Sequence, residues 1–258
     1  MADLPLFLLA LAALLAGFVD AVVGGGGLIQ VPALFALQPT ADPASLFGTN
    51  KGASVFGTLS AAGRYLRRVS IPWRATLYAA FAAFPASYLG ALSVAWLPRE
   101  LLRPLILVLL IVSAAYTFWR KDFGSLHRPA HAGTREMAYA LLLGAAIGFY
   151  DGFFGPGTGS FLIFLFVRYF GFDFLHATAA AKVVNGTTNL AALAYFLPHG
   201  QLLPTVALLM AVCNVLGAQA GSHLALRHGS GFVRVIFLVV VSALILRFAW
   251  EMLRPAGI

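Results

Sequence analysis

Four charged residues inside apolar stretches are the groups in this sequence that could do chemistry. Asp20 and Asp151 each stand near the end of an apolar run, and Lys51 and Lys182 lie within later ones. If these runs cross a membrane, such charges are costly and normally face a partner, a cavity or a transport pathway. The four charges sum to zero, which fits two buried ion pairs. The pairs could serve helix packing alone. Alternatively, the lysines attract an anion, and the aspartates act as their counter-ions or carry a coupling proton.

A glycine-rich break follows each of the two aspartates. Gly24 to Gly27 form the first break, and Gly155, Pro156 and Gly157 form the second. Each glycine costs a helix about 1 kcal/mol relative to alanine. Backbone groups freed in a membrane need partners from protein, water or a ligand. A helix that starts after the break offers free N–H groups and a positive end to an anion. Close helix packing is the alternative explanation. The candidate site includes, from these breaks, Gly25, Gly26, Gly27, Gly157 and Thr158.

Amide side chains surround the two lysines. Asn50 directly precedes Lys51, and Asn185 and Asn189 follow Lys182 one helical turn apart, on one face. These side chains could hydrogen-bond between helices or contact a ligand. We include all three in the candidate substrate site, beside the four charged residues. Asp42 and Asp173 are the expected N-caps of the lysine-bearing helices. Lys51 would then lie about 12–14 Å along its helix axis, deep in the hydrocarbon core.

Composition places the chain in a membrane. Of its 258 residues, 60% are hydrophobic and only 10% are charged, against roughly 25% charged in soluble domains. The mean hydropathy is +0.88. The net charge of +8 sits in short loops between apolar runs, a distribution that orients membrane proteins and does not indicate nucleic-acid binding. The first apolar run has no basic segment before it, so we expect a retained helix and not a cleaved signal peptide.

The chain repeats itself at an offset of 131 residues. Adding 131 leads from Asp20 to Asp151 and from Lys51 to Lys182, and it also pairs Asp42 with Asp173. The whole sequence has only three lysines and six aspartates, so chance matching in an alanine- and leucine-rich chain does not explain these pairs. Internal duplication is characteristic of transporter folds.

The expected fold is an all-α membrane protein with two homologous repeats. Each repeat has a glycine-broken first helix or hairpin and three transmembrane helices. The first repeat covers residues 1–119, a cytoplasmic linker covers 120–135, and the second repeat covers 136–258. Apolar segments are expected at 4–22, 28–38, 44–64, 75–98, 104–119, 136–154, 159–170, 174–196, 203–226 and 231–252.

Basic residues favour an inverted orientation of the second repeat. The loop with Arg67 and Arg68 and the linker with Arg120 and Lys121 are strongly basic, whereas residues 197–203 contain no lysine or arginine. Cytoplasmic loops carry the excess of basic residues, so equivalent loops would lie on opposite sides. A broken hairpin plus three crossings gives the odd number of crossings that inversion requires. If each broken segment crosses once, the repeats are parallel instead.

The motifs resemble a known family. The segments GFVDAVVGGGGLIQVPAL, GTNK, GFYDGFFGPGTGSF and AAKVVNGTTN are similar to those of the TauE/SafE (sulfite exporter) membrane transporters, and most of all to their YfcA-like branch. The resemblance covers both halves in order. It implies a bacterial inner-membrane transporter of sulfur-containing or carboxylate anions, such as sulfite, sulfoacetate or another organosulfonate. The resemblance implies a functional role for the residues that match the family's motifs, namely Asp20, Gly24 to Gly27, Lys51, Asp151, Gly155, Gly157 and Lys182.

We therefore expect a secondary transporter of a small anion that works by alternating access between the repeats. It would be a multi-pass protein of the bacterial inner membrane and not an enzyme. Its partners are membrane lipid and the anion, with a homodimer left open, and no cofactor is expected. The sequence has no nucleotide-binding Gly-x-x-x-x-Gly-Lys-Ser/Thr motif and no metal-ligand spacing among its histidines. The main alternative is a passive channel or cation transporter that uses Asp20 and Asp151. An intramembrane aspartyl protease and a structural scaffold fit less well.

Overall fold

The computed structural model describes residues 3–96, 127 and 133–253, and this described part contains helices and no β-strand. In the first half, α1 (Asp3–Val23) and α2 (Gly27–Leu37) flank the first glycine break. They are followed by α3 (Pro43–Leu66), α4 (Trp73–Leu92) and the short 3₁₀ helix η1 (Ser93–Trp96). The four predicted segments between residues 4 and 98 are thus confirmed to within a few residues. The segment predicted at 104–119 lies outside the described residues.

The second half follows the same order of elements. It contains α6 (Thr134–Phe153), α7 (Thr158–Phe170), α8 (Phe174–Phe196) and α9 (Pro204–Leu253). Two separate segments were predicted where α9 runs. The structure confirms two helical stretches, which meet at a sharp kink at Gly229, where φ is 73°, ψ is −167° and the backbone is not helical. Glycine adopts a positive φ at little cost, so the chain can leave the helix at this residue and turn. Most of the predicted linker 120–135 lies outside the described residues, and its last two positions already belong to α6.

Both lysine-bearing helices begin at the predicted aspartate caps. The Asp42 carboxylate accepts hydrogen bonds from the backbone N–H of Ala44 at 3.3 Å and of Ser45 at 2.9 Å. Asp173 accepts one from the backbone N–H of His176 at 2.9 Å. Such caps satisfy N–H groups that have no partner inside the first helical turn. They fix where α3 and α8 start, and hence how deep Lys51 and Lys182 lie.

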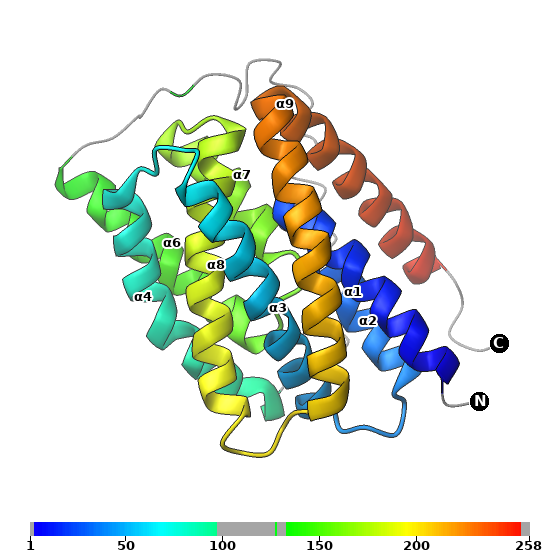
Figure 1. Ribbon diagram of the computed structural model, residues 1–258. Helices are drawn as coiled ribbons and strands as arrows, with labels where there is room; N and C mark the ends of the chain where they lie inside the picture. Colours follow the sequence, from blue (N-terminus) through cyan, green and yellow to red (C-terminus); the bar gives the residue numbers. More distant parts are fainter. Residues whose placement is uncertain (1–2, 97–126, 128–132, 254–258) are drawn as a thin grey trace.

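Each glycine break turns the chain back towards the end of the bundle from which it came. Figure 1 shows α1 running from the N-terminus into the bundle and α2 returning towards the same end. It also shows α6 and α7 doing the same from the opposite end, and α3 and α8 running in opposite directions. Of the two expected geometries, broken helix or hairpin, the described structure has hairpins.

Helices of the two halves pack against each other with their backbones close together. In the described residues α1 packs on α9 and α6 packs on α4, while α3 contacts both α8 and α9. Glycines allow this approach: Gly90 lies against the backbone of Phe149, and Gly221 lies against that of Phe18. Small residues at helix crossings are typical of membrane bundles, because lipid gives helices no hydrophobic reason to associate.

The outer surface suits a lipid environment. Three described helices are long and apolar enough to span a membrane, at Leu4–Val23, Trp73–Leu92 and Pro204–Val240. Large apolar side chains point outward along them, among them Phe81, which is 77% exposed, and Leu208, which is 69% exposed. In contrast, the polar side chains of Lys51, Lys182 and Asp151 are buried. The bundle therefore has an apolar outside and a charged interior, the reverse of a soluble domain.

Candidate functional site

The two glycine breaks touch each other inside the bundle. The backbone N–H of Ser160 donates to the carbonyl oxygen of Gly24 at 2.8 Å, and the Ser160 hydroxyl donates to the carbonyl of Val23 at 2.9 Å. Gly24 has a left-handed φ of 78°, and a side chain there would meet the backbone of Gly159. Backbone groups freed by one break are thus satisfied by the other, as the membrane interior demands.

We expect Gly24→Ala to destabilise the protein by more than about 2 kcal/mol, because it combines a left-handed backbone with a backbone collision. The thermal unfolding midpoint of the detergent-purified protein would measure the change. Gly63→Ala is the matched control, since a Cβ at Gly63 in α3 would meet nothing within 4 Å. Its stability should stay unchanged or rise by up to about 1 kcal/mol. Equal midpoints for the two variants would show that the breaks do not need their close approach.

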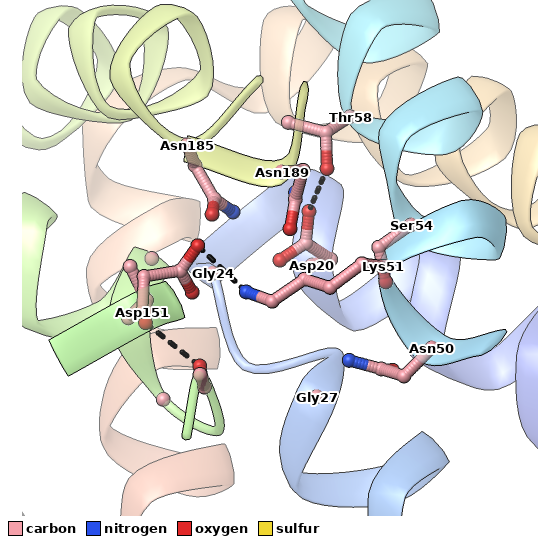
Figure 2. Close-up of a pocket in the computed structure, with 14 residues that line it drawn as sticks. Asp20, Gly24, Gly27, Asn50, Lys51, Ser54, Thr58, Asp151, Asn185 and Asn189 are labelled. Carbon is pink, nitrogen blue, oxygen red and sulfur yellow. Dashed lines mark hydrogen bonds and ion pairs between the residues drawn. The ribbon is translucent and has the colours of Figure 1, made fainter. Parts of the chain in front are cut away.

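The four buried charges form two ion pairs, and each pair joins one half of the chain to the other. The Lys51 ammonium on α3 lies 2.7 Å from Asp151 on α6, as Figure 2 shows. The Lys182 ammonium on α8 lies 2.9 Å from Asp20 on α1. Both lysines are at most 2% exposed. Because a buried charge without a partner is strongly unfavourable, these pairs tie the halves together.

A small pocket lies where the breaks and the ion pairs meet. Its empty volume is about 280 Å³, counting the open space at its edge. Of the candidate residues from the sequence, it gathers Asp20, Gly27, Asn50, Lys51, Asp151, Gly157, Thr158, Asn185 and Asn189. The other three do not line it: Lys182 is fully buried behind Asp20, and neither Gly25 nor Gly26 reaches its wall.

Five lining residues were missing from the sequence-based site, and two of them had a clear signal. Ser54 and Thr58 line the pocket from α3 beside Lys51. Adding 131 leads from Ser54 to Asn185 and from Thr58 to Asn189. Because Asn185 and Asn189 were in the predicted site, the internal repeat could have identified Ser54 and Thr58 as well. Gly24, Gly155 and Gly159 also line the wall. Gly24 and Gly155 were already named as break residues and as positions that the family resemblance carries over, whereas the place of Gly159 depends on how the two breaks cross.

Two helix N-termini point their positive ends at this pocket. α2 starts at Gly27 after Gly26, and α7 starts at Thr158 after Gly157, and neither start has a side-chain cap. An uncapped helix start carries partial positive charge and suits an anion. The Lys51 ammonium lies in the same wall. The pocket therefore combines one full and two partial positive charges with carboxylates that already have lysine partners.

A second polar cluster lies at the α7–α8 end of the bundle. His127, Asp173 and His176 place possible ligand atoms within 4.8 Å of one another, and the His127 and His176 rings stack at 4.1 Å. Burial and the neighbouring His176 lower the pKa of His127. Burial alone would raise the pKa of Asp173, but hydrogen bonds from His176 and Ser230 lower it. No local sequence pattern indicates this cluster, because His127 belongs to the linker and meets His176 only in the fold.

A helical membrane bundle whose broken hairpins meet at a polar pocket is typical of membrane transporters. The chain belongs to the sulfite exporter TauE/SafE family, whose model matches residues 9–248. It is a membrane transporter of that family and not an enzyme, as the resemblance of its motifs predicted.

Relatives of similar length support this assignment. A Sinorhizobium protein named "Probable membrane transporter protein ORF9" is 37% identical over 261 residues, covering 100% of this chain and 98% of its own length. The Escherichia coli K12 protein named "Probable membrane transporter protein YfcA" is 36% identical over 90% of this chain and 84% of its own length. A Haemophilus influenzae "Probable membrane transporter protein" is 35% identical over 87% of each chain. No solved structure matches this chain.

Proposed function

We propose that this protein is a secondary transporter of a small oxyanion, of the sulfur-containing or carboxylate class, in the inner membrane of a bacterium. The observation that carries the proposal is that Lys51 lines the pocket together with the starts of two helices that have no side-chain cap. Such a site offers charge-assisted hydrogen bonds to the oxygens of a compact anion. The family description names sulfite exporters, which fits an oxyanion substrate.

Alternating access between two inverted repeats is the transport mechanism we propose. Its support is the symmetry of the pocket wall, where residues 131 positions apart face one another. Adding 131 leads from Asp20 to Asp151, from Gly24 to Gly155 and from Gly27 to Thr158, and all six line the pocket. Two similar halves around one site can exchange conformations and so open the site to either side of the membrane.

One observation favours a second candidate, a cation pathway. Of the residues that the structure describes, two with carboxylates but only one with an ammonium group line the pocket, because Lys182 lies behind Asp20. Lys182 nevertheless offsets the Asp20 charge at 2.9 Å, and the helix N-termini add positive potential. The balance of charge therefore favours an anion, and ligand binding separates the two candidates.

The test is thermal stabilisation of the purified protein by a panel of sodium salts: sulfite, methanesulfonate, sulfoacetate, sulfate and acetate. Selective binding to the folded state raises stability by about 2.7 kcal/mol when the ligand is at 100 times its Kd. We expect at least one oxyanion to raise the unfolding midpoint, and we expect Lys51→Gln to abolish that rise. Lys121→Gln, a change of the linker lysine, is the matched control and should respond as the wild type does.

Stabilisation by cations and not by anions would contradict the proposal. If the panel has no effect, whereas chloride salts of different cations stabilise the protein and still do so in Lys51→Gln, the anion proposal is wrong. Asp20 and Asp151 would then be the residues of a cation pathway.

A further inference from the structure

The two buried ion pairs differ in how firmly each carboxylate is held. Lys182 contacts both the carboxylate and the backbone carbonyl oxygen of Asp20. The same carboxylate also accepts a hydrogen bond from the Thr58 hydroxyl at 3.3 Å. Lys182 is 0% exposed and takes no part in the pocket wall. This pair can therefore keep its charges without help from a ligand.

The other pair is held by a single contact. Lys51 and Asp151 are each 2% exposed and both line the pocket. The Asp151 Oδ2 atom lies at ion-pair distance from Lys51, yet among the described residues no donor reaches it with hydrogen-bond geometry. The hydroxyl of the adjacent Tyr150 is occupied elsewhere, since it donates to the Pro156 carbonyl. The remaining charges near this pair are Asp20 across the pocket and Lys182 behind it.

An anion that binds Lys51 competes with Asp151 for the same ammonium. If the anion took the ammonium and Asp151 stayed ionised, a buried carboxylate would be left without the one ion-pair partner that it has among the described residues. Breaking a buried pair in this way costs about 3–5 kcal/mol. Protonation removes the unpaired charge, and the resulting carboxyl group can donate a hydrogen bond to the bound oxyanion. Asp20 faces no such competition, because Lys182 does not reach the pocket wall.

We propose that anion binding at Lys51 and protonation of Asp151 form one coupled step, while Asp20 remains ionised against Lys182. The inference rests on the proposed function and assigns its coupling ion. One proton joins the Asp151 carboxylate, and one negative charge of the ligand replaces that carboxylate at the Lys51 ammonium. The charge of the site is the same before and after, so a monoanion and a proton cross together without net charge movement.

Proton uptake on binding measures this coupling directly. Methanesulfonate is the probe, because a sulfonate remains a monoanion near neutral pH and takes up no proton itself. Calorimetric titration in buffers of equal pH but different ionisation enthalpy reports the number of protons taken up per bound anion. We expect about one for the wild type, with affinity falling about tenfold per pH unit in the range where free Asp151 is ionised.

Substitutions of Asp151 test whether its carboxylate is the group that takes up the proton. Asp151→Asn should bind methanesulfonate with no proton uptake and with little dependence on pH, because its amide imitates the protonated acid. Asp151→Glu keeps a titratable carboxyl group and should retain uptake. Glu136→Gln, on the same helix as Asp151 but outside the pocket lining, is the matched control and should retain uptake as well.

The results of these titrations distinguish failure of the proposed function from failure of the proposed proton coupling. If neither methanesulfonate nor any other anion of the panel binds to the wild type, the proposed function fails, and the coupling fails with it. If methanesulfonate binds to the wild type without proton uptake, the coupling alone is overturned, whether or not any variant folds. Uptake that survives in Asp151→Asn would also overturn the assignment to Asp151.

Discussion

Lys182→Met is expected to lower the free energy of unfolding by about 3 kcal/mol or more. The substitution leaves the Asp20 carboxylate without its ammonium partner, and removing one member of a buried pair typically costs about 3–5 kcal/mol. Asp20 is 14% exposed and keeps the Thr58 hydroxyl, which places the expected loss at the lower end of that range. Chemical unfolding in detergent micelles, followed by circular dichroism, would measure it.

The double variant Lys182→Met, Asp20→Asn tests the cause of that loss. It removes both charges, so no unpaired buried ion remains, and it should recover most of the stability lost by the single variant. A double variant no more stable than Lys182→Met would mean that packing around the lysine, and not the charge of Asp20, determines stability. A fully stable single variant would contradict the ion pair itself.

The second large effect concerns transport. The double variant Lys51→Gln, Asp151→Asn should fold, because it replaces a buried ion pair with two neutral amides of similar size. It should nevertheless lose at least tenfold in anion affinity, since a charge-assisted hydrogen bond contributes about 1.5–3 kcal/mol. Uptake into proteoliposomes of the anion that stabilises the wild type most strongly would measure the accompanying loss of transport.

The Lys182→Met, Asp20→Asn variant is the matched control for this experiment. It removes the same number of charges from the Asp20–Lys182 pair, whose lysine lies behind the pocket wall. It leaves Lys51 available to the anion. Its affinity for the anion should remain within a fewfold of that of the wild type. Equal loss of binding in both double variants would show that the two pairs act as one unit, without the division of roles inferred from their contacts.

Local features of the sequence were enough to place the helices and to name most of the residues that line the pocket. Asp42 and Asp173 cap α3 and α8 because a short acidic side chain can reach the first free N–H groups of a helix. The glycine break before Gly27 ends α1 because four successive glycines give a helix little stability. Depth along α3 and α8 then follows from the fixed rise per residue, so both lysines could be located in the bundle interior. Gly229 separates the two segments predicted at 203–226 and 231–252, because its positive φ interrupts the helix between them.

The sequence by itself determined that this is a polytopic helical membrane protein with paired charges and duplicated breaks. Hydropathy and helix caps depend on neighbouring residues, and the 131-residue register is visible in the sequence itself. All three can therefore be recognised without a structure. Only the tertiary structure decided that Lys51 meets Asp151 and Lys182 meets Asp20, and that Lys182 lies behind the pocket wall. Those partners depend on the opposite directions in which the two hairpins enter the bundle (Figure 1) and on the contact between Gly24 and Ser160 where they cross. Helical periodicity predicts which side chains share one face of a helix. It does not predict which other helix that face packs against, because this depends on contacts between segments more than a hundred residues apart.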